Sequence, residues 1–345
     1  MSTKNGKDYR GEDVEREIVR MLWLFHFATT DQLCRLLWND GARSSRRKLV
    51  LPLRRLYDMH MIWREPRRTS PGYRSHLNGR AASGWSYGLT ETGRMWATEA
   101  MPELTSLRCT TREGYMHNPD RRTITHSTHH TEFCTRIIER LRGDTSTVAI
   151  FIETESTVLG NHLRMDGLVR LRLRHHAASV VGQPRDERMP WHVPWLPTLR
   201  APALEGTFDA TFAIEIDEGT ESLPILEAKA QNYRRTFMHG MLTMQRMRTD
   251  GGAYDLSAEP WHLVLCPPNI DPAEAVAYFP IPVVVMNSET RLANVSRVWN
   301  RGWPNSEVRM TTWEHLGRAR SLMSAHYLNQ DEQWVDLLGN IHDER

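Results

Sequence analysis

The chain contains only four cysteines in 345 residues, and none stands in a Cys-x-x-Cys pair. Cys34, Cys109, Cys134 and Cys266 are scattered, which argues against a disulfide framework and against a zinc ribbon. The sequence also lacks an apolar run long enough to cross a bilayer, and its N-terminus has no apolar signal-peptide region. We therefore expect a cytoplasmic protein without a membrane partner.

The whole chain has almost no excess of positive over negative side chains, since its net charge is only +2. The basic residues are instead concentrated. Between residues 41 and 80 there are eleven Arg and Lys side chains but only two acidic ones, Asp58 and Glu65. Such a block is the electrostatic signature of a phosphate-binding surface. The alternative is a solvated basic face that has no partner.

The first hundred residues have the pattern of a helix-turn-helix domain. Apolar residues at helical spacing predict a first helix over 12–26. Residues 29–32 (TTDQ) form a capping-box pattern that opens a short second helix, and Ser44 or Ser45 begins a third. Pro52 lies inside this third helix and predicts either a bend or a break into two helices.

Two strand-like runs, 61–63 and 85–89, follow the three helices and enclose a loop rich in Gly, Ser and Asn. This order predicts a winged-helix DNA-binding domain over residues 10–100, with a helical protein-binding domain as the alternative. The expected DNA contacts come from the third helix and the loop: Arg43, Arg46, Arg47, Lys48, Arg54, Arg67, Arg68 and Arg74.

The rest of the chain predicts a second domain with a mixed sheet flanked by helices, so the fold class is α+β or α/β with two domains. We expect a linker over 101–125, the domain over 126–290 with an insertion near 174–206, and a helical extension over 291–345. The expected strands are 148–152, 163–173, 210–217, 261–266 and 281–286, and the expected helices are 129–141, 222–247 and 311–328.

Carboxylates on the strand 210–217 carry the candidate chemistry. The period of two in a strand places Glu215 and Asp217 on one face. Asp166, in the neighbouring strand, adds a third carboxylate, and such oxygen ligands suit Mg²⁺ or Mn²⁺. Lys229, in the following helix, is then expected to stabilise the transition state of phosphodiester hydrolysis. The alternative is that Glu215 and Asp217 form the solvated face of an edge strand.

The sequence resembles the replication-relaxation family. The resemblance is carried by the predicted winged helix and by three segments that follow it: Arg164–Gly167, Phe212–Glu221 and Lys229–Arg234. The resemblance covers roughly residues 12–290. Members of the family occur on plasmids and other mobile elements of bacteria. The resemblance implies a second domain similar to PD-(D/E)XK nucleases and to a class of mobilisation relaxases built on that fold.

The same resemblance assigns roles to the residues. Asp166 matches the first acidic position of the nuclease motif, although Met165 stands where that motif has proline, and Glu215 matches the second. Asp217 occupies the place of the usual lysine, so the resemblance implies that Lys229 is a lysine displaced to the next helix. A nuclease fold that has lost its activity can survive as a DNA-binding platform.

A further candidate site lies in the stretch 126–134. His126, His130 and Cys134 follow one another at helical spacing, which is typical of a transition-metal stripe, but no fourth ligand at matching spacing is evident. The other interpretation is that one histidine and Glu132 line the nuclease-like cleft, since family members carry a histidine there.

These observations predict a mobile-element protein that recognises double-stranded DNA and nicks or relaxes it in a metal-dependent reaction during replication or mobilisation. We expect replication or conjugation proteins as further partners, and the sequence is compatible with a homodimer. One alternative is a non-catalytic DNA-binding regulator whose second domain dimerises or docks partners. Another is a scaffold for protein contacts.

Overall fold

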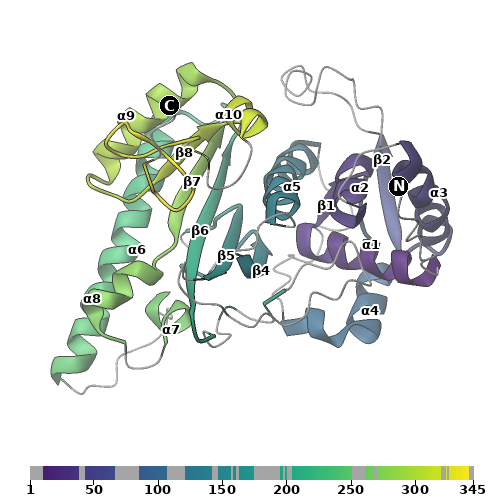
Figure 1. The fold of residues 1–345 in the computed structure, drawn as a ribbon, viewed down its shortest axis with the longest axis horizontal. Coiled ribbons are helices and arrows are strands. Elements are labelled where there is room, and N and C mark those ends of the chain that lie inside the picture. Colours follow the sequence, from purple (N-terminus) through teal and green to yellow (C-terminus); the bar gives the residue numbers. More distant parts are fainter. Residues whose placement is uncertain are drawn as a thin grey trace, which may run out of the picture. The chain divides into compact units, whose positions relative to one another are not determined.

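The computed structural model describes residues 11–38, 43–66, 85–106, 121–141, 147–156, 158–160, 163–174, 195–196, 199, 204–250, 261–267, 270–319, 324 and 326–341. These residues form two compact units (Figure 1), the first ending at Thr135 and the second beginning at Arg136. The boundary therefore falls inside α5 (Arg121–Leu141), which begins earlier than the helix expected from His129. In the part of the chain described here, no helix has the length and apolar character needed to cross a membrane.

The first unit alternates helices with short strands. Its elements are α1 (Gly11–Phe25), β1 (Phe27–Thr29), α2 (Thr30–Trp38), α3 (Arg43–Asp58), β2 (Ile62–Pro66), β3 (Trp85–Leu89), α4 (Glu91–Ala100), the 3₁₀ turn η2 (Pro102–Ser106) and the first part of α5. The strands form an antiparallel sheet in the order β1-β3-β2. Leu33, Leu49 and Leu56 are buried on the inner faces of α2 and α3, as their spacing predicts.

Local sequence signals define the helix boundaries of this unit. The capping box is confirmed: the Thr29 N–H donates to Gln32 Oε1 at 2.9 Å, and the Gln32 N–H donates to Thr29 Oγ1 at 3.3 Å. Of the two alternatives expected at Pro52, a bend or a break, the break is wrong, because α3 is one continuous helix with Pro52 inside it. A single proline removes one backbone hydrogen bond, and the buried leucines on either side keep the helix packed.

The second unit is built on a seven-stranded mixed sheet in the order β10-β9-β8-β7-β6-β5-β4. Its strands are β4 (Thr147–Thr154), β5 (Gly167–Arg174), β6 (Thr207–Asp217), β7 (Ile281–Met286), β8 (Arg309–Thr312), β9 (Tyr327–Leu328) and β10 (Trp334–Val335). The pairs among β4, β5 and β6 are antiparallel, whereas β6, β7 and β8 run parallel. The mixed α and β character predicted from the sequence is therefore confirmed.

Helices connect and cover these strands (Figure 1). They are α6 (Leu223–Asp250), α7 (Trp261–Leu265), α8 (Pro272–Ala275), the 3₁₀ turn η3 (Val276–Tyr278), α9 (Glu289–Gly302) and α10 (Trp313–Arg318). The long helix α6 follows β6 directly and packs against α9. The carboxyl ends of β6 and β7 thus lie at one edge of the sheet, where α6 and α9 begin.

Two predicted elements differ from the structure. The expected strand 261–266 is the helix α7, because periodicity cannot separate a short apolar strand from a buried helix. Its Trp261 ring stacks with Phe237 at 6.2 Å between centroids. The expected helix 311–328, and with it the purely helical extension over 291–345, is also wrong: this segment supplies β8, β9 and β10, and α10 starts only after the Thr312 side chain caps its N-terminus.

Candidate functional site

A buried glutamate, a lysine and a tyrosine meet where β6 packs against α6. Glu215 is 2% exposed, and its Oε2 lies 2.6 Å from Lys229 Nζ. The Tyr233 hydroxyl donates to the other carboxylate oxygen of Glu215 at 2.6 Å. Lys229 and Tyr233 are four residues apart and hence on one face of α6. The structure thus brings the predicted lysine directly to the predicted carboxylate.

Asp166 lies beside this group, one residue before β5 and not inside it as expected. The antiparallel register pairs Gly167 with Ile214, so the next position places Asp166 next to Glu215. One oxygen of Asp166 accepts a hydrogen bond of 2.7 Å from the backbone N–H of Ile216. This bond fixes the carboxylate at the carboxyl end of β6, close enough for its charge to contribute to the raised pKa of Glu215.

Burial and charge change the acidity of all three side chains on α6 and β6. Burial raises the pKa of Glu215 to about 7, and the nearby Asp166 adds to the rise, whereas Lys229 and Tyr233 oppose it. Burial disfavours the charged form of Lys229, but Glu215 and Asp166 outweigh it and raise the pKa of that ammonium. Burial, reinforced by Glu215, raises the pKa of Tyr233 well above its usual range. Tyr233 is therefore a hydrogen-bond donor here.

Asp217, the third predicted carboxylate, has a different partner. Arg291 Nε donates to one oxygen of Asp217 at 2.6 Å, and the second guanidinium nitrogen reaches the other oxygen at 3.1 Å. The Gly219 N–H also donates to Asp217, at 2.8 Å. In the described residues no group of three or more His, Cys, Asp or Glu side chains is arranged to hold a metal ion. Both oxygens of Asp217 already accept hydrogen bonds from Arg291.

Arg291 was missed in the sequence. It lies in the first turn of α9, 74 residues from Asp217, and it also donates to the Glu221 carbonyl. The available signal was topological: β6 and β7 are parallel, so the residue that follows β7 comes near the end of β6. Tyr233 belonged to a segment of the family resemblance, but its bond to Glu215 required the structure.

The predicted DNA-binding residues separate into two groups. Arg46, Arg47, Lys48 and Arg54 are all exposed on α3. Arg67, Arg68 and Arg74 lie outside the described residues, as does the side chain of Arg43. The structure therefore places four cationic side chains at exposed positions of one helix, and the contacts expected from the loop stay a prediction.

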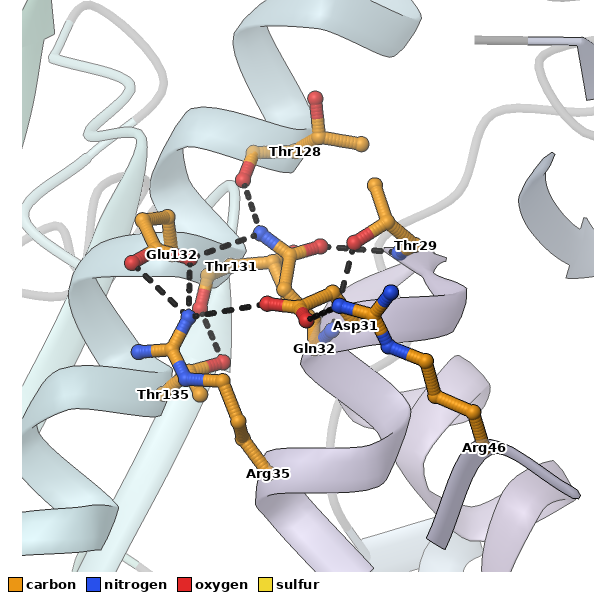
Figure 2. A network of polar contacts seen from close by, with 9 residues as sticks. All are labelled: Thr29, Asp31, Gln32, Arg35, Arg46, Thr128, Thr131, Glu132 and Thr135. Atoms are coloured by element: carbon orange, nitrogen blue, oxygen red, sulfur yellow. Dashed lines mark hydrogen bonds and ion pairs between the residues drawn. The ribbon is translucent and has the colours of Figure 1, made fainter. Parts of the chain in front are cut away.

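Figure 2 shows a polar network that links α3, α2 and α5 within the first unit. Arg46 reaches Asp31 at 2.6 Å, and Arg35 lies 3.7 Å from the same carboxylate. Arg35 also donates to both oxygens of Glu132, at 2.8 and 3.0 Å. Gln32 donates to the Thr128 carbonyl at 2.8 Å, which joins the capping box to α5.

The histidine-rich start of α5 gives no metal centre among the described residues. Cys134 Sγ lies 3.5 Å from His130 Nε2, and both are buried. Burial raises the pKa of the Cys134 thiol far above its usual value, which disfavours the thiolate that binds zinc. Glu132 is buried at the Arg35 ion pair, so within the first unit it holds α5 to α2.

Comparison with protein families gives a direct assignment. The model of the family described as replication-relaxation matches residues 19–249, about two thirds of the chain. The chain belongs to the replication-relaxation family. No curated protein and no solved structure matches it significantly.

The replication-relaxation match covers both candidate surfaces described above. It includes α3 with its exposed cations, and it also includes Asp166, Glu215, Lys229 and Tyr233. Arg291 lies beyond the matched residues, so the engagement of Asp217 involves a part of the chain outside the family match.

Proposed function

We propose that this member of the replication-relaxation family binds double-stranded DNA through its first unit and nicks it with its second, in replication or mobilisation of a plasmid or other mobile element. The observation that carries the catalytic part is the ion pair between Lys229 and Glu215, which lies beside Asp166 at the carboxyl end of β6. Two carboxylates and one ammonium are the residue types that metal-dependent phosphodiester cleavage uses.

Support for DNA binding comes from the order of elements in the first unit. A helix, a strand, two helices and two further strands follow one another, and the three strands form an antiparallel sheet; this order supports the interpretation as a winged helix. In that interpretation α3 is the recognition helix, and Arg46, Arg47, Lys48 and Arg54 are its exposed cations. Neutralisation of phosphates by such side chains supplies most of the non-specific affinity for DNA.

The residues at the second site fit a divalent cation of the Mg²⁺ type. Asp166 and Glu215 both offer carboxylate oxygen, and their mutual repulsion contributes to the raised pKa of Glu215. A cation between them would relieve that repulsion. Because Asp217 is engaged by Arg291, we assign the metal to Asp166 and Glu215 and give Asp217 the role of fixing the end of β6.

When bound, the ion supplies charge neutralisation at the phosphodiester and an activated water. The residues of the chain do the rest. Lys229, whose side chain is 22% exposed, is accessible to a phosphate oxygen and neutralises charge that develops there. Tyr233 fixes the orientation of the Glu215 carboxylate through its hydrogen bond.

A time course of supercoiled-plasmid nicking across a Mn²⁺ series tests the proposal. Glu215→Ala and Asp166→Ala should abolish nicking while duplex binding stays nearly unchanged. Lys229→Ala should reduce the rate on the order of a hundredfold even at saturating metal, which separates it from a ligand defect. Glu227→Ala, an acidic residue of α6 that pairs with Arg301, is the matched control. Absence of nicking by the wild type under every metal would refute the enzyme assignment.

One observation favours a second candidate, a DNA-binding regulator with an inactive nuclease fold. Lys229 already neutralises Glu215 and Arg291 neutralises Asp217, so the carboxylates have cationic partners of their own. In that case Glu215→Gln leaves plasmid maintenance and duplex binding intact, whereas loss of the α3 cations abolishes both.

A further inference from the structure

One cation of the first unit that is not among those assigned above lies over two aromatic rings, whereas Lys48 lies over one, that of Trp38, at 5.8 Å. The guanidinium of Arg64, on β2, lies over two aromatic rings, 4.3 Å from the centroid of Tyr57 and 4.6 Å from that of Trp85. Tyr57 comes from α3 and Trp85 from β3, so three elements build the arrangement. We call these three residues the Arg64 clamp.

The Arg64 clamp lies open to solvent. Tyr57 is 39% exposed, Trp85 is 38% exposed, and Arg64 itself is exposed. Arg64 has no hydrogen bond or ion pair to any residue that the structure describes. Stacking on two rings fixes the plane of the guanidinium while its N–H donors stay available, and a preoriented planar donor is suited to a phosphate group.

The clamp continues an exposed face of α3. Arg47, Val50, Arg54 and Tyr57 follow one another at intervals of three or four residues and are all exposed, so they form one stripe along the helix. From Arg47 to Tyr57 this stripe is roughly 15 Å long at 1.5 Å per residue. The major groove is about 12 Å wide. A helix that enters the groove with its first turns therefore brings its last turn near the opposite sugar-phosphate backbone.

We propose that the Arg64 clamp is a phosphate-binding site that grips the DNA backbone at the C-terminal end of the α3 stripe. The proposal rests on the DNA-binding part of the proposed function. It assigns Tyr57 and Trp85 the role of orienting Arg64, and Arg64 that of contacting a phosphodiester oxygen. The site adds a preoriented backbone contact to those made by the cations of α3.

The test is a titration of the full-length protein with a fluorescent random-sequence duplex at several salt concentrations. Arg64→Ala should weaken binding on the order of tenfold and lower the salt slope by about one, the value of one phosphate contact. Arg64→Lys keeps the charge but not the planar donor, so affinity should fall severalfold while the slope stays. Tyr57→Leu should act like Arg64→Lys, because it leaves the charge but releases the guanidinium.

Arg55→Ala is the matched control, since Arg55 is an exposed cation of the same helix that pairs with Glu15 of α1 at 3.4 Å. The change in affinity of Arg55→Ala measures the effect of losing one positive charge on this helix. Thermal unfolding of each variant distinguishes a loss of affinity from a loss of folding. If Arg64→Ala and Arg64→Lys bind like Arg55→Ala, the Arg64 clamp only stabilises the fold and this inference is wrong.

Arg47→Ala distinguishes failure of the Arg64 proposal from failure of the proposed DNA-binding function. Binding that depends on Arg47 but not on Arg64 leaves the proposed function standing and removes the clamp. A wild type that does not bind duplex DNA at all refutes both.

Discussion

At the scale of the residue, Arg46 in the first unit has two competing partners: the carboxylate of Asp31 and the proposed DNA phosphate. Arg46 is one of the cations assigned to DNA, yet its guanidinium is bound by Asp31 at 2.6 Å (Figure 2). Arg35 stands 3.7 Å from the same carboxylate and is itself held by Glu132. If Arg46 moves to a phosphate, Asp31 keeps a cation nearby. The network therefore allows Arg46 to exchange partners at little electrostatic cost.

From this arrangement we predict that Asp31→Asn raises the affinity for duplex DNA by about threefold to tenfold. The substitution frees Arg46 from a surface ion pair of modest strength and removes a negative charge close to the approaching phosphates. Glu15→Gln, which neutralises the acidic partner of Arg55, is the control and should change the affinity by less than about twofold. Anisotropy titrations measure both. Weaker binding by Asp31→Asn would mean that Asp31 orients Arg46 for its contact.

In the proposed metal-dependent reaction, the protonation of Glu215 sets the pH dependence of the nicking rate. Its pKa is raised to about 7, chiefly by burial, and the carboxylate is the form that binds a cation. The ionised fraction grows as the pH rises through 7, so nicking at limiting metal should rise over the same range. The hydrogen bond from Tyr233 favours the carboxylate. Tyr233→Phe should therefore move the rising limb upward by about one pH unit.

The measurement is the nicking rate at fixed, subsaturating Mn²⁺ over a pH series. Tyr278→Phe, which removes a hydroxyl from the half-buried Tyr278 in η3 of the same unit, is the control and should leave the limb in place. A Tyr233→Phe profile that falls in amplitude without moving would show that Tyr233 acts only through packing.

Residue-level expectations succeeded where the signal was local in sequence. The Glu215 and Lys229 pair was predictable because a strand of known period leads directly into a helix. The role of Arg291 was not, because 74 residues separate it from Asp217. Its position depends on β6 and β7 being parallel neighbours, and sheet order cannot be read from composition or periodicity.

Among the elements, helix packing in the second unit depends on one close approach. A Cβ atom at Gly302, the last residue of α9, would lie 2.6 Å from the Glu227 carbonyl oxygen and 2.8 Å from the Ala230 Cβ on α6. These two helices make one of the main contacts of the unit, and α6 carries Lys229 and Tyr233. The spacing of α6 and α9 therefore bears on the site itself.

We predict that Gly302→Ala destabilises the protein by about 1–3 kcal/mol, the usual cost of overpacking a close contact. Gly317→Ala is the control, because the nearest atom to its added Cβ is the Arg136 guanidinium at 3.9 Å. In a helix this second change should be neutral or slightly stabilising. Urea unfolding followed by circular dichroism compares the two. Equal stability of both variants would show that α9 can shift away from α6 without cost.

Elements were predictable according to their length and flanking signals. The strands β4, β6 and β7 were all expected, and β4 and β7 are rich in the β-branched residues that favour strands. The six residues from Trp261 to Cys266, apolar except for His262, were ambiguous; in the helix that forms, Trp261 packs against Phe237 and Phe279. The C-terminal strands β9 and β10 have only two residues each, too few for any period to appear, and pairing with the existing sheet edge creates them.

At the scale of the whole molecule, the proposed function divides the work between two units. In this proposal the α3 cations hold the duplex equally in the ground state and the transition state, whereas Lys229 acts on charge that develops only during cleavage. Interactions of the first kind change KM when they are removed, whereas those of the second kind change kcat.

We therefore predict that Arg47→Ala raises KM for plasmid nicking with little change in kcat, and that Lys229→Ala lowers kcat with little change in KM. Because the two residues belong to different compact units, their free-energy effects should add, and the loss of kcat/KM in the double variant should equal the product of the single losses. Initial nicking rates over a range of plasmid concentrations give all four values, and a separate duplex titration checks that KM follows Kd. Arg55→Ala combined with Lys229→Ala is the control pair. A double variant that departs from the product by more than about threefold, beyond ordinary additivity error, would mean that DNA contact in the first unit alters the Lys229 site, and the division of labour would be wrong.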